Sequence, residues 1–393
     1  RKNIVCGGET VRYGHLERVE IVLRTLSPVF IGSGEQLTKK EYIYDRDDGV
    51  IYILNLAKLV EYLSAKRLEG AYERFLLSPR KNDLHAFLYE NGVSREDYGS
   101  FASYAIDAGE VASSEHFRGV LMFLKGPDGK PYIPGSSLKG AIRTAIGAKL
   151  LEKGKYENET ERIEKAAAVY KNRDRKRYVS MEARHLESRL FCKLGITDPK
   201  KHDRVKWNSI PNDFMRGISI SDSLPIEFKN LTLCGKHDRK PDGKSEQLPI
   251  YRECLAPDTE ARFVMTLDRT ITDKLGIDLD FIQDALRSFS EKHYENYEKY
   301  YKDLPEDAED KSTSGMKIIL GGGSGYVSKT LTYPLVRDRE RAVKLVSEMM
   351  MKQFSKHEHE KDLKVYRVSP HILKTTMYKG KYYHMGKCEL TFR

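Results

Sequence analysis

The order in which strand patterns and helical patterns follow one another is the feature that most limits what this chain can fold into. Residues 17–26 alternate apolar and polar side chains, and this period of two is typical of a half-buried β-strand. Further strand patterns lie at 42–44, 50–54, 117–124, 215–221, 226–233, 261–267 and 316–320. Apolar residues at helical spacing mark 56–66, 71–77, 137–151, 280–301 and 338–354. The order strand, helix, strands, helix thus occurs twice, which predicts an α+β fold with helices on one face of antiparallel sheets.

The length of 393 residues indicates two domains, because a domain usually holds roughly 100 to 200 residues. We expect an N-terminal domain over residues 1–210 and a C-terminal domain over residues 211–393. The stretch 151–210 is polar, helical and rich in charge, and we interpret it as a helical insertion in the N-terminal domain. Its basic run at 171–177 matches no motif known to us.

Composition narrows the class of protein without naming a partner. Lys and Arg number 68 against 58 Asp and Glu, a net charge of +10, so a polyanionic partner fits, although many proteins of this charge bind no nucleic acid. The five cysteines are odd in number and scattered, which argues against a disulfide framework or a zinc knuckle. No long apolar stretch exists, and residues 1–8 lack the core of a secretory signal. We therefore expect a cytoplasmic protein that does not contact a membrane.

The start of the helix predicted at 137–151 carries a first candidate phosphate site. Ser136 is the expected N-cap, and Ser137 begins the helix. Lys139 and Arg143 are four residues apart and share one helix face, and we expect both side chains to lie outside the core. A cation near the positive end of the helix dipole costs roughly 0.3 to 1 kcal/mol, and a bound anion would reverse this effect. The alternative interpretation is a basic face that only contacts water.

A glycine-rich loop at 321–330 carries the second candidate site. It nearly matches a P-loop, but Ser328 replaces the required glycine and Pro334 would stop the following helix, which argues against an NTPase. Such a loop can still lie against a sugar-phosphate backbone while Tyr326 stacks on a base and Lys329 pairs with phosphate. The alternative is a tight structural crossover.

The sequence shows no motif for nucleophilic, acid–base or cofactor chemistry. His357 and His359 are two residues apart in a helical pattern, where their side chains do not face each other, so a metal pair is not expected. We therefore predict no cofactor, no metal and no catalytic residue.

The order of several short motifs resembles one known family. These motifs are LSPVFIGSG at 26–34, PGSSLKG at 134–140, MRGISISDS at 215–223, the loop at 321–330 and KGKYY at 379–383. Together they resemble the RAMP superfamily of CRISPR proteins, and most of all the head-end RAMP subunit of the type III-A effector, the Csm complex. The resemblance covers nearly the whole chain.

This resemblance implies a fold and a function. The fold would be two ferredoxin-like, RRM-like domains with helical insertions. The function would be that of a non-catalytic subunit of an antiviral ribonucleoprotein, which binds the 3′ part of the single-stranded guide RNA (crRNA), caps a filament of smaller RAMP subunits and assists crRNA maturation. The RNA-binding residues it implies are Ser33, Gly34, Ser137, Lys139, Arg143, Gly321, Gly322, Gly323, Ser324, Gly325, Tyr326 and Lys329.

Two other functions stay open. One is a metal-independent RAMP endoribonuclease that cuts CRISPR repeat RNA with a histidine as general acid or base. The distribution of histidines disfavours it, because none lies between Gln36 and Leu84, and His15 precedes the first strand. The other is a module that only assembles with proteins and binds RNA no better than any protein of equal charge.

Overall fold

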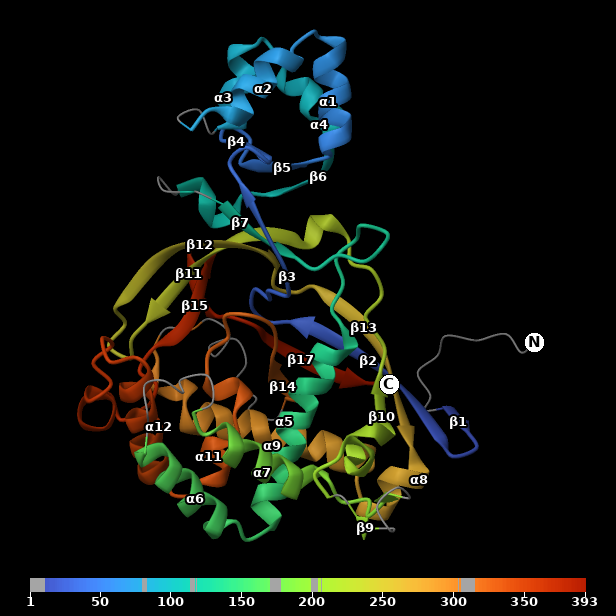
Figure 1. The fold of residues 1–393 in the computed structure, drawn as a ribbon, viewed down its shortest axis with the longest axis vertical. Helices are drawn as coiled ribbons and strands as arrows, with labels where there is room; N and C mark the ends of the chain where they lie inside the picture. Colours follow the sequence, from blue (N-terminus) through green and yellow to red (C-terminus); the bar gives the residue numbers. More distant parts are fainter. Residues whose placement is uncertain are drawn as a thin grey trace.

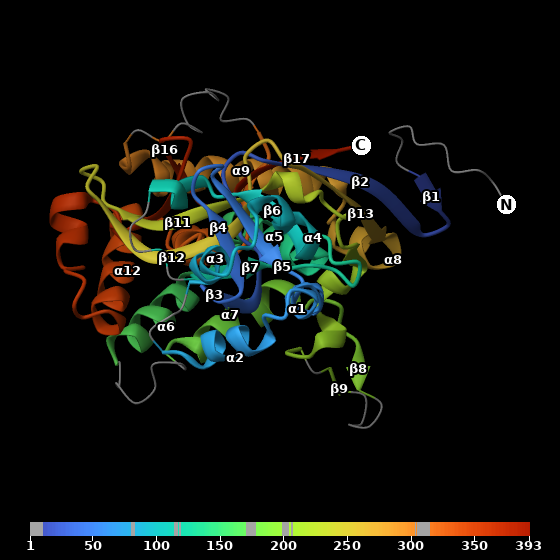
Figure 2. The same ribbon diagram turned by 90° about the horizontal axis from the view of Figure 1, so that it is seen from above.

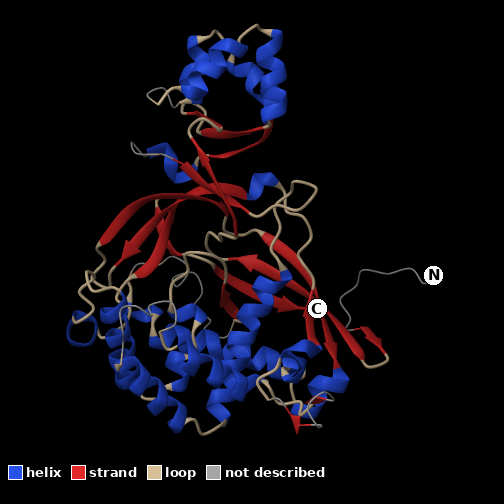
Figure 3. Ribbon diagram, in the orientation of Figure 1, coloured by secondary structure: helices blue, strands red, loops and turns tan. Residues whose placement is uncertain are grey.

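The computed structural model describes residues 11–79, 83–113, 117, 119–169, 178–198, 204–205, 207–302, 304 and 315–393. The molecule is an α+β protein with two large β-sheets (Figures 1 and 3). A lobe of short helices forms one end, and a layer of longer helices forms the other. The predicted α+β class is therefore confirmed.

The first sheet is antiparallel and is centred on β2 (Leu16–Thr25), the strand predicted at 17–26. Val19, Ile21 and Leu23 are buried, as the period of two predicts. The strand order is β10 (Ile218–Ile220), β13 (Glu260–Asp268), β2, β17 (Lys387–Phe392) and β14 (Lys317–Ile319), and β1 (Val11–Tyr13) pairs with β2 as well. In both Figures 1 and 2, β17 lies beside β2 although the two strands come from opposite ends of the chain.

Two long helices, α5 (Gly135–Lys153) and α9 (Leu279–Asn296), pack against each other and against this sheet. Leu138 of α5 and Leu286 of α9 enter the main hydrophobic core together with the buried side chains of β2. Along the chain, with other elements between them, β2, α5, β10, β13, α9 and β17 occur in the order strand, helix, strand, strand, helix, strand. In the sheet, the first of these strands lies between the third and the fourth.

The second sheet is mixed, which differs from the antiparallel sheet that we expected. Its strand order is β3 (Gly32–Thr38), β7 (Gly119–Phe123), β12 (Ser245–Leu255), β11 (Leu231–Arg239), β6 (Ala102–Asp107), β5 (Val50–Leu54) and β4 (Tyr42–Asp45). Within it, β11 pairs in parallel with β6, and β12 pairs in parallel with β7. The hairpin of β15 (Leu373–Tyr378) and β16 (Lys381–His384) joins this sheet through β15, which pairs with the last three residues of β11.

Both sheets combine strands from before and after residue 210. A division of the chain at 210/211 would therefore separate paired strands such as β2 and β13, or β7 and β12. The predicted boundary stays a prediction.

A helical lobe lies between β5 and β6 in the chain and at the top of Figure 1. It has a core of its own, which includes Leu59, Phe75 and Phe87. Its helices are α1 (Leu56–Ala65), α2 (Glu69–Leu77), α3 (Leu84–Glu90) and α4 (Tyr98–Phe101), so the helices predicted at 56–66 and 71–77 are confirmed.

A further group of helices lies at the other end of the molecule. It consists of α6 (Glu157–Ala168), α7 (Ser180–Phe191), α11 (Thr332–Leu335) and α12 (Arg339–Gln353), and the short α8 (Arg269–Thr272) follows β13. The expected insertion at 151–210 thus includes α6 and α7 and the small pair β8 (Thr197–Asp198) and β9 (Arg204–Val205). The basic run at 171–177 lies outside the described residues. None of the helices in the described part combines the length and the apolar character that crossing a bilayer requires.

Candidate nucleic-acid interface

Three segments that are far apart in the chain line one hollow of about 430 Å³. They are the turn after β2, the first turns of α5 and the glycine-rich loop after β14. The described residues that line the hollow come from 31–32, 136–144 and 319–329, and they include no aspartate or glutamate. A hollow of this kind favours an anion over a cation.

The start of α5 gives the hollow one free backbone donor, the N–H of Ser136. The helix begins at Gly135, the N-cap is Pro134, and the first turn contains no acidic residue. The Gly135 N–H donates to Asp222 Oδ1 at 2.8 Å, and the Ser137 N–H donates to the Pro134 carbonyl at 3.0 Å. Within the described residues, the Ser136 N–H has no hydrogen-bond partner, so the positive end of the helix dipole faces the hollow.

The prediction that Ser136 is the N-cap is therefore wrong. Pro134 holds the extended conformation that precedes the helix, and Asp222, which follows β10, supplies the carboxylate that caps it. A side chain at Gly135 would overlap the backbone carbonyls of residues 220 and 221, so only glycine allows this close approach.

The glycine-rich loop lies directly against the turn after β2. The Gly322 N–H donates to the Phe30 carbonyl at 2.7 Å. Gly321 has a φ of +78°, and a Cβ there would overlap the same carbonyl oxygen. Glycine at this position allows the loop to contact the turn after β2. As a result of this contact, Gly32 lines the hollow.

Lys329 is the cation of the hollow. It sits in a single 3-10 turn (Val327–Lys329) and not at the start of a long helix, as the lysine of a P-loop would. Its Nζ donates to the Gly321 carbonyl, which ties the two ends of the loop together. The residue as a whole is exposed, but protein on both sides removes part of its hydration and lowers its pKa.

Some predicted site residues line this hollow and others do not. Ser137, Gly321, Gly322 and Lys329 do. Ser33 and Gly34 lie next to it in β3, where the Ser33 hydroxyl donates to the Met122 carbonyl at 3.3 Å and Gly34 has a φ of +91° with open space around it. Their role in binding stays a prediction.

Lys139 and Arg143 share a face of α5, as predicted, and that face is only partly exposed to solvent. Arg143 Nη1 donates to Asp213 Oδ2 at 2.8 Å, and the guanidinium lies 3.7 Å from the ring centroid of Phe191. Lys139 is half-buried; burial lowers its pKa, and the charge of Arg143 adds to this effect while Asp213 opposes it. Both side chains are half-buried, and α7 and the segment after it cover Arg143.

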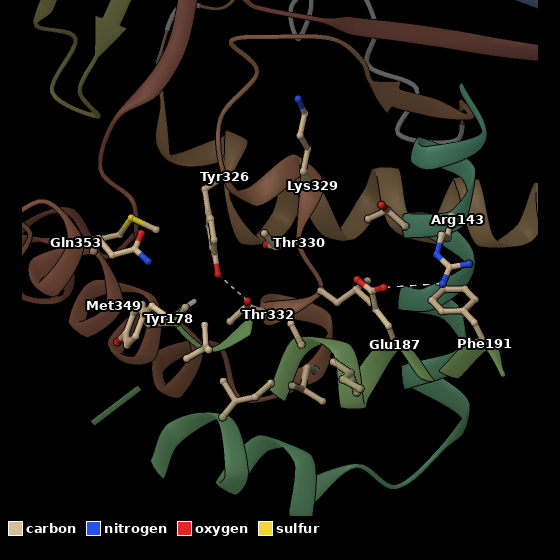
Figure 4. A pocket seen from close by; sticks show the side chains of 18 residues that line it. Arg143, Tyr178, Glu187, Phe191, Tyr326, Lys329, Thr330, Thr332, Met349 and Gln353 are labelled. Atoms are coloured by element: carbon tan, nitrogen blue, oxygen red, sulfur yellow. Dashed lines mark hydrogen bonds and ion pairs between the residues drawn. The ribbon is translucent and has the colours of Figure 1, made fainter. Parts of the chain in front are cut away.

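A second cavity of about 340 Å³ adjoins the hollow and shares Thr144 and Lys329 with it (Figure 4). Figure 4 shows Tyr326 and Lys329 pointing in opposite directions. The Tyr326 hydroxyl is 2.9 Å from Thr332 Oγ1, and burial raises its pKa. Tyr326 therefore faces this cavity and not the hollow, so the predicted stacking on a base would have to take place here.

The remaining loop residues face away from the hollow. Gly323 lies against the guanidinium of Arg252, and Gly325 lies near Lys374. Ser324 is buried, and its carbonyl is 3.4 Å from His384 Nε2. The loop thus separates the hollow from a polar interior that the sequence did not reveal.

Glu298 is at the centre of that interior. Its carboxylate contacts His384 Nδ1 at 2.7 Å, His293 Nδ1 at 3.4 Å and Lys387 Nζ at 2.9 Å. Burial alone would raise the pKa of Glu298, but the charge of Lys387 and the two histidine hydrogen bonds together lower it well below its usual value. Glu298 lies 86 residues before His384 and 89 before Lys387, so no local pattern could have grouped the pair His293 and Glu298 with these two residues.

His359, Asp362 and His371 are the described residues whose geometry could hold a metal ion. All three are buried, and the Asp362 carboxylate already accepts hydrogen bonds from both His Nδ1 atoms and, at 2.6 Å, from the Ser369 hydroxyl. Hydrogen bonds therefore satisfy this group without an ion. His371 is twelve residues after His359, so local sequence spacing did not reveal the cluster.

His15, the histidine considered for RNA cleavage, lies in the exposed turn between β1 and β2. It is not among the described residues that line the hollow or the adjoining cavity.

Comparison of the sequence with known proteins identifies a family to which this chain is similar. A sequence profile of the RAMP superfamily matches residues 22–327. The chain is 28% identical to the CRISPR system Cms protein Csm5 of Mycobacterium tuberculosis, over 96% of this chain and 98% of that protein. It is 31% identical to the protein of the same name from Streptococcus thermophilus, over 79% of each chain.

Two solved structures share the fold. One is a chain in the cryo-EM structure of a Csm–crRNA–target RNA ternary complex of a type III-A CRISPR-Cas system, with a TM-score of 0.62, 21% identity and coverage of 95% of this chain and 100% of that one. The other is the crystal structure of T. onnurineus Csm5, with a TM-score of 0.60, 19% identity and coverage of 94% and 99%.

Proposed function

The chain belongs to the RAMP superfamily and, within it, to the Csm5 family, and from this premise we propose that it is a non-catalytic subunit of a type III-A Csm complex that holds the backbone of the crRNA. The observation that carries the proposal is the hollow between α5 and the glycine-rich loop. It combines a free helix N-terminus, close-lying glycine backbone and the ammonium of Lys329, and its described lining has no carboxylate.

These groups suit a phosphodiester. Backbone N–H groups and a lysine recognise phosphate oxygens but do not distinguish one base from another, so binding at the hollow is independent of sequence. The adjoining cavity continues the path toward Arg143. A third hollow of about 600 Å³ shares Arg143 and adds Arg162 and Arg184. Glu187 and Asp213, the carboxylates that pair with Arg143, line this hollow as well. A single strand can follow these cations along α5, with contacts at Ser33, Gly34, Lys139 and the rest of the loop completing the site.

The first sheet with α5 and α9 is then one ferredoxin-like domain. Its elements follow the order β-α-β-β-α-β of that fold, and their strands take the corresponding places in the sheet. The second sheet belongs to the second such domain. The likeness to two solved structures supports a common fold for the whole chain.

Membership of the Csm5 family supports the wider role. The chain caps the filament of smaller RAMP subunits on the 3′ side of the crRNA and assists crRNA maturation in antiviral defence. The ternary complex that contains a chain of the same fold holds crRNA and target RNA, which agrees with an RNA-bound assembly.

The experiment that tests the function measures binding of a labelled single-stranded RNA to the purified chain over a range of salt concentrations. We expect log K to fall linearly with log salt, with a slope of roughly 0.7 per phosphate contact. A protein of similar size and net charge serves as the control. Equal affinity of the two proteins would favour the assembly module and contradict the proposal.

The endoribonuclease stays a weaker alternative, because His15 does not line the hollow. Incubation of labelled repeat RNA with the chain in chelator should give no specific product. A specific cut that His15→Ala abolishes would establish the nuclease and contradict the non-catalytic role.

A further inference from the structure

A cluster of cations lies on the far side of the glycine-rich loop from the hollow. Lys236 of β11, Arg252 of β12 and Lys374 of β15 surround one carboxylate, Asp238. Lys374 Nζ donates to both Asp238 oxygens, at 2.9 and 2.8 Å, while Lys236 Nζ is 4.0 Å away. Glu246 lies opposite Asp238 on β12, but it is exposed and forms no ion pair with the three cations. The cluster itself has three positive charges and one negative charge.

The guanidinium of Arg252 is buried and has few polar partners. Only 9% of it is exposed, its Nε has no hydrogen-bond partner among the described residues, and Nη1 donates to the sulfur of Met385 at 3.3 Å. Its guanidinium lies over the ring of Phe30 at 5.4 Å, and no carboxylate pairs with it. Burial lowers the pKa of Arg252, and the opposing effects of Cys254, Asp238 and Cys234 do not cancel this. A guanidinium buried in this way is costly unless an anion approaches it.

The neighbouring lysines add to this positive field. Their side chains are 20% and 28% exposed, for Lys236 and Lys374 respectively, so they form a rim through which an anion can approach. Burial lowers the pKa of Lys236, and the charges of Lys374 and Arg252 lower it further while Asp238 opposes them. Without a bound anion, each positive charge therefore makes the charged state of the other two side chains less favourable.

The cluster lies directly beneath the loop. A Cβ at Gly323 would overlap Arg252 Nη1, so the loop lies directly against the guanidinium, and the φ of +78° there favours glycine. A Cβ at Gly325 would lie 3.7 Å from Lys374 Cγ, an ordinary contact. One face of the loop thus belongs to the hollow, and the other face lies on the cations.

We propose that Lys236, Arg252 and Lys374 form a second phosphate site, which takes a phosphodiester of the RNA that crosses the glycine-rich loop. The two lysines contact the phosphate oxygens from the rim, and Arg252 supplies charge and donors from the floor. The proposal rests on the proposed function, since it assumes that a strand of RNA lies on the loop. The bound phosphate would balance the excess of positive charge.

The test compares Arg252→Met with the unchanged protein, because methionine is apolar and fills much of the same volume. The variant should bind labelled single-stranded RNA roughly tenfold more weakly at about 0.1 M salt, with a salt slope smaller by roughly 0.7. Without RNA its Tm should stay equal or rise, because an unpaired buried charge has been removed. A fall in Tm with unchanged RNA affinity would show that Arg252 only supports the fold, and would overturn the proposal.

Inorganic phosphate provides a second readout. At equal ionic strength, phosphate should raise the Tm of the unchanged protein above its value in chloride, and Arg252→Met should reduce that difference. An equal difference in both proteins would count against the site.

Lys236→Gln keeps the test decisive if Arg252→Met fails to fold, because Lys236 forms no close hydrogen bond with Asp238. It should also weaken RNA binding several-fold, whereas Lys58→Gln, an exposed lysine of the helical lobe, should not. If the unchanged protein binds no RNA beyond the charge-matched control, the proposed function itself fails. If it binds RNA and both cluster variants bind equally well, only the second phosphate site is contradicted.

Discussion

The guanidinium of Arg143 stacks on the ring of Phe191, 3.7 Å from the ring centroid, and this contact joins α5 to α7. Arg143 is only 28% exposed and also pairs with Asp213. Loss of the cation–π contact and of the ion pair should destabilise Arg143→Ala by about 2 kcal/mol. Urea unfolding followed by circular dichroism measures this change.

Lys139→Ala is the matched control for that prediction. Lys139 is a neighbouring cation of the same helix face, but it makes no hydrogen bond or ion pair within the described residues. Its removal should change the free energy of unfolding by less than about 0.5 kcal/mol. Equal destabilisation by both substitutions would show that the contacts of Arg143 do not stabilise the fold.

The contact between Gly321 and Phe30 predicts an effect on both stability and binding. Gly321→Ala would put an L side chain at a φ of +78° and against the Phe30 carbonyl, so we expect a loss of about 3 kcal/mol and weaker RNA binding as the loop moves. Gly380→Ala is the control: at a φ of +76° with open space around it, it adds the backbone strain without a steric overlap. It should lose about 1 kcal/mol and bind RNA normally. If both variants lost the same free energy, the close approach of the loop would be unimportant.

The buried carboxylate of Glu298 predicts a specific acid sensitivity. Because the folded protein lowers the pKa of Glu298, this group contributes stability above its unfolded value of about 4.3, and the contribution is lost as pH falls through the lower folded value. Glu298→Gln removes that titration and breaks the buried ion pair with Lys387, so it should destabilise the protein by about 3 to 5 kcal/mol at pH 7.

Urea unfolding between pH 7 and pH 3 measures both effects. The unchanged protein should lose more stability than Glu298→Gln as the pH falls below about 4.3, so the difference between them should shrink. A constant difference over this range would contradict the low pKa of Glu298.

Local patterns predicted much of the fold. The alternation at 17–26 became β2, and the helical spacing at 338–354 became α12, because each pattern reflects one buried face. The longest strand, β12, was missed, since its first half is exposed and contains Pro249. The helix predicted to run to residue 301 ends at Asn296, where the chain turns to bury Tyr297 and Glu298.

The site was only partly predictable, for a different reason. Glycines and a helix start suggested three binding segments, but their meeting depends on contacts between residues nearly 300 positions apart, such as Phe30 and Gly322. The same long-range packing covers Arg143 and gathers Lys236, Arg252 and Lys374 beneath the loop. None of these contacts follows from local spacing.

The central claim is that the hollow at the start of α5 holds RNA phosphate, and Ser136→Glu tests it most directly. Ser136 is exposed in the first turn and lines the hollow. A carboxylate there suits the helix dipole, which offsets repulsion from Asp222, so stability should stay within about 0.5 kcal/mol. Ser64→Glu, on an exposed face of the helical lobe, makes the same change of charge elsewhere.

The deciding measurement is the affinity of both variants for a labelled single-stranded RNA as a function of salt concentration. Ser136→Glu should bind roughly tenfold more weakly than the unchanged protein at about 0.1 M salt, with a slope smaller by roughly 0.7, while Ser64→Glu should bind normally. Equal affinity and equal slope for Ser136→Glu and Ser64→Glu would contradict the claim that RNA phosphate occupies this hollow.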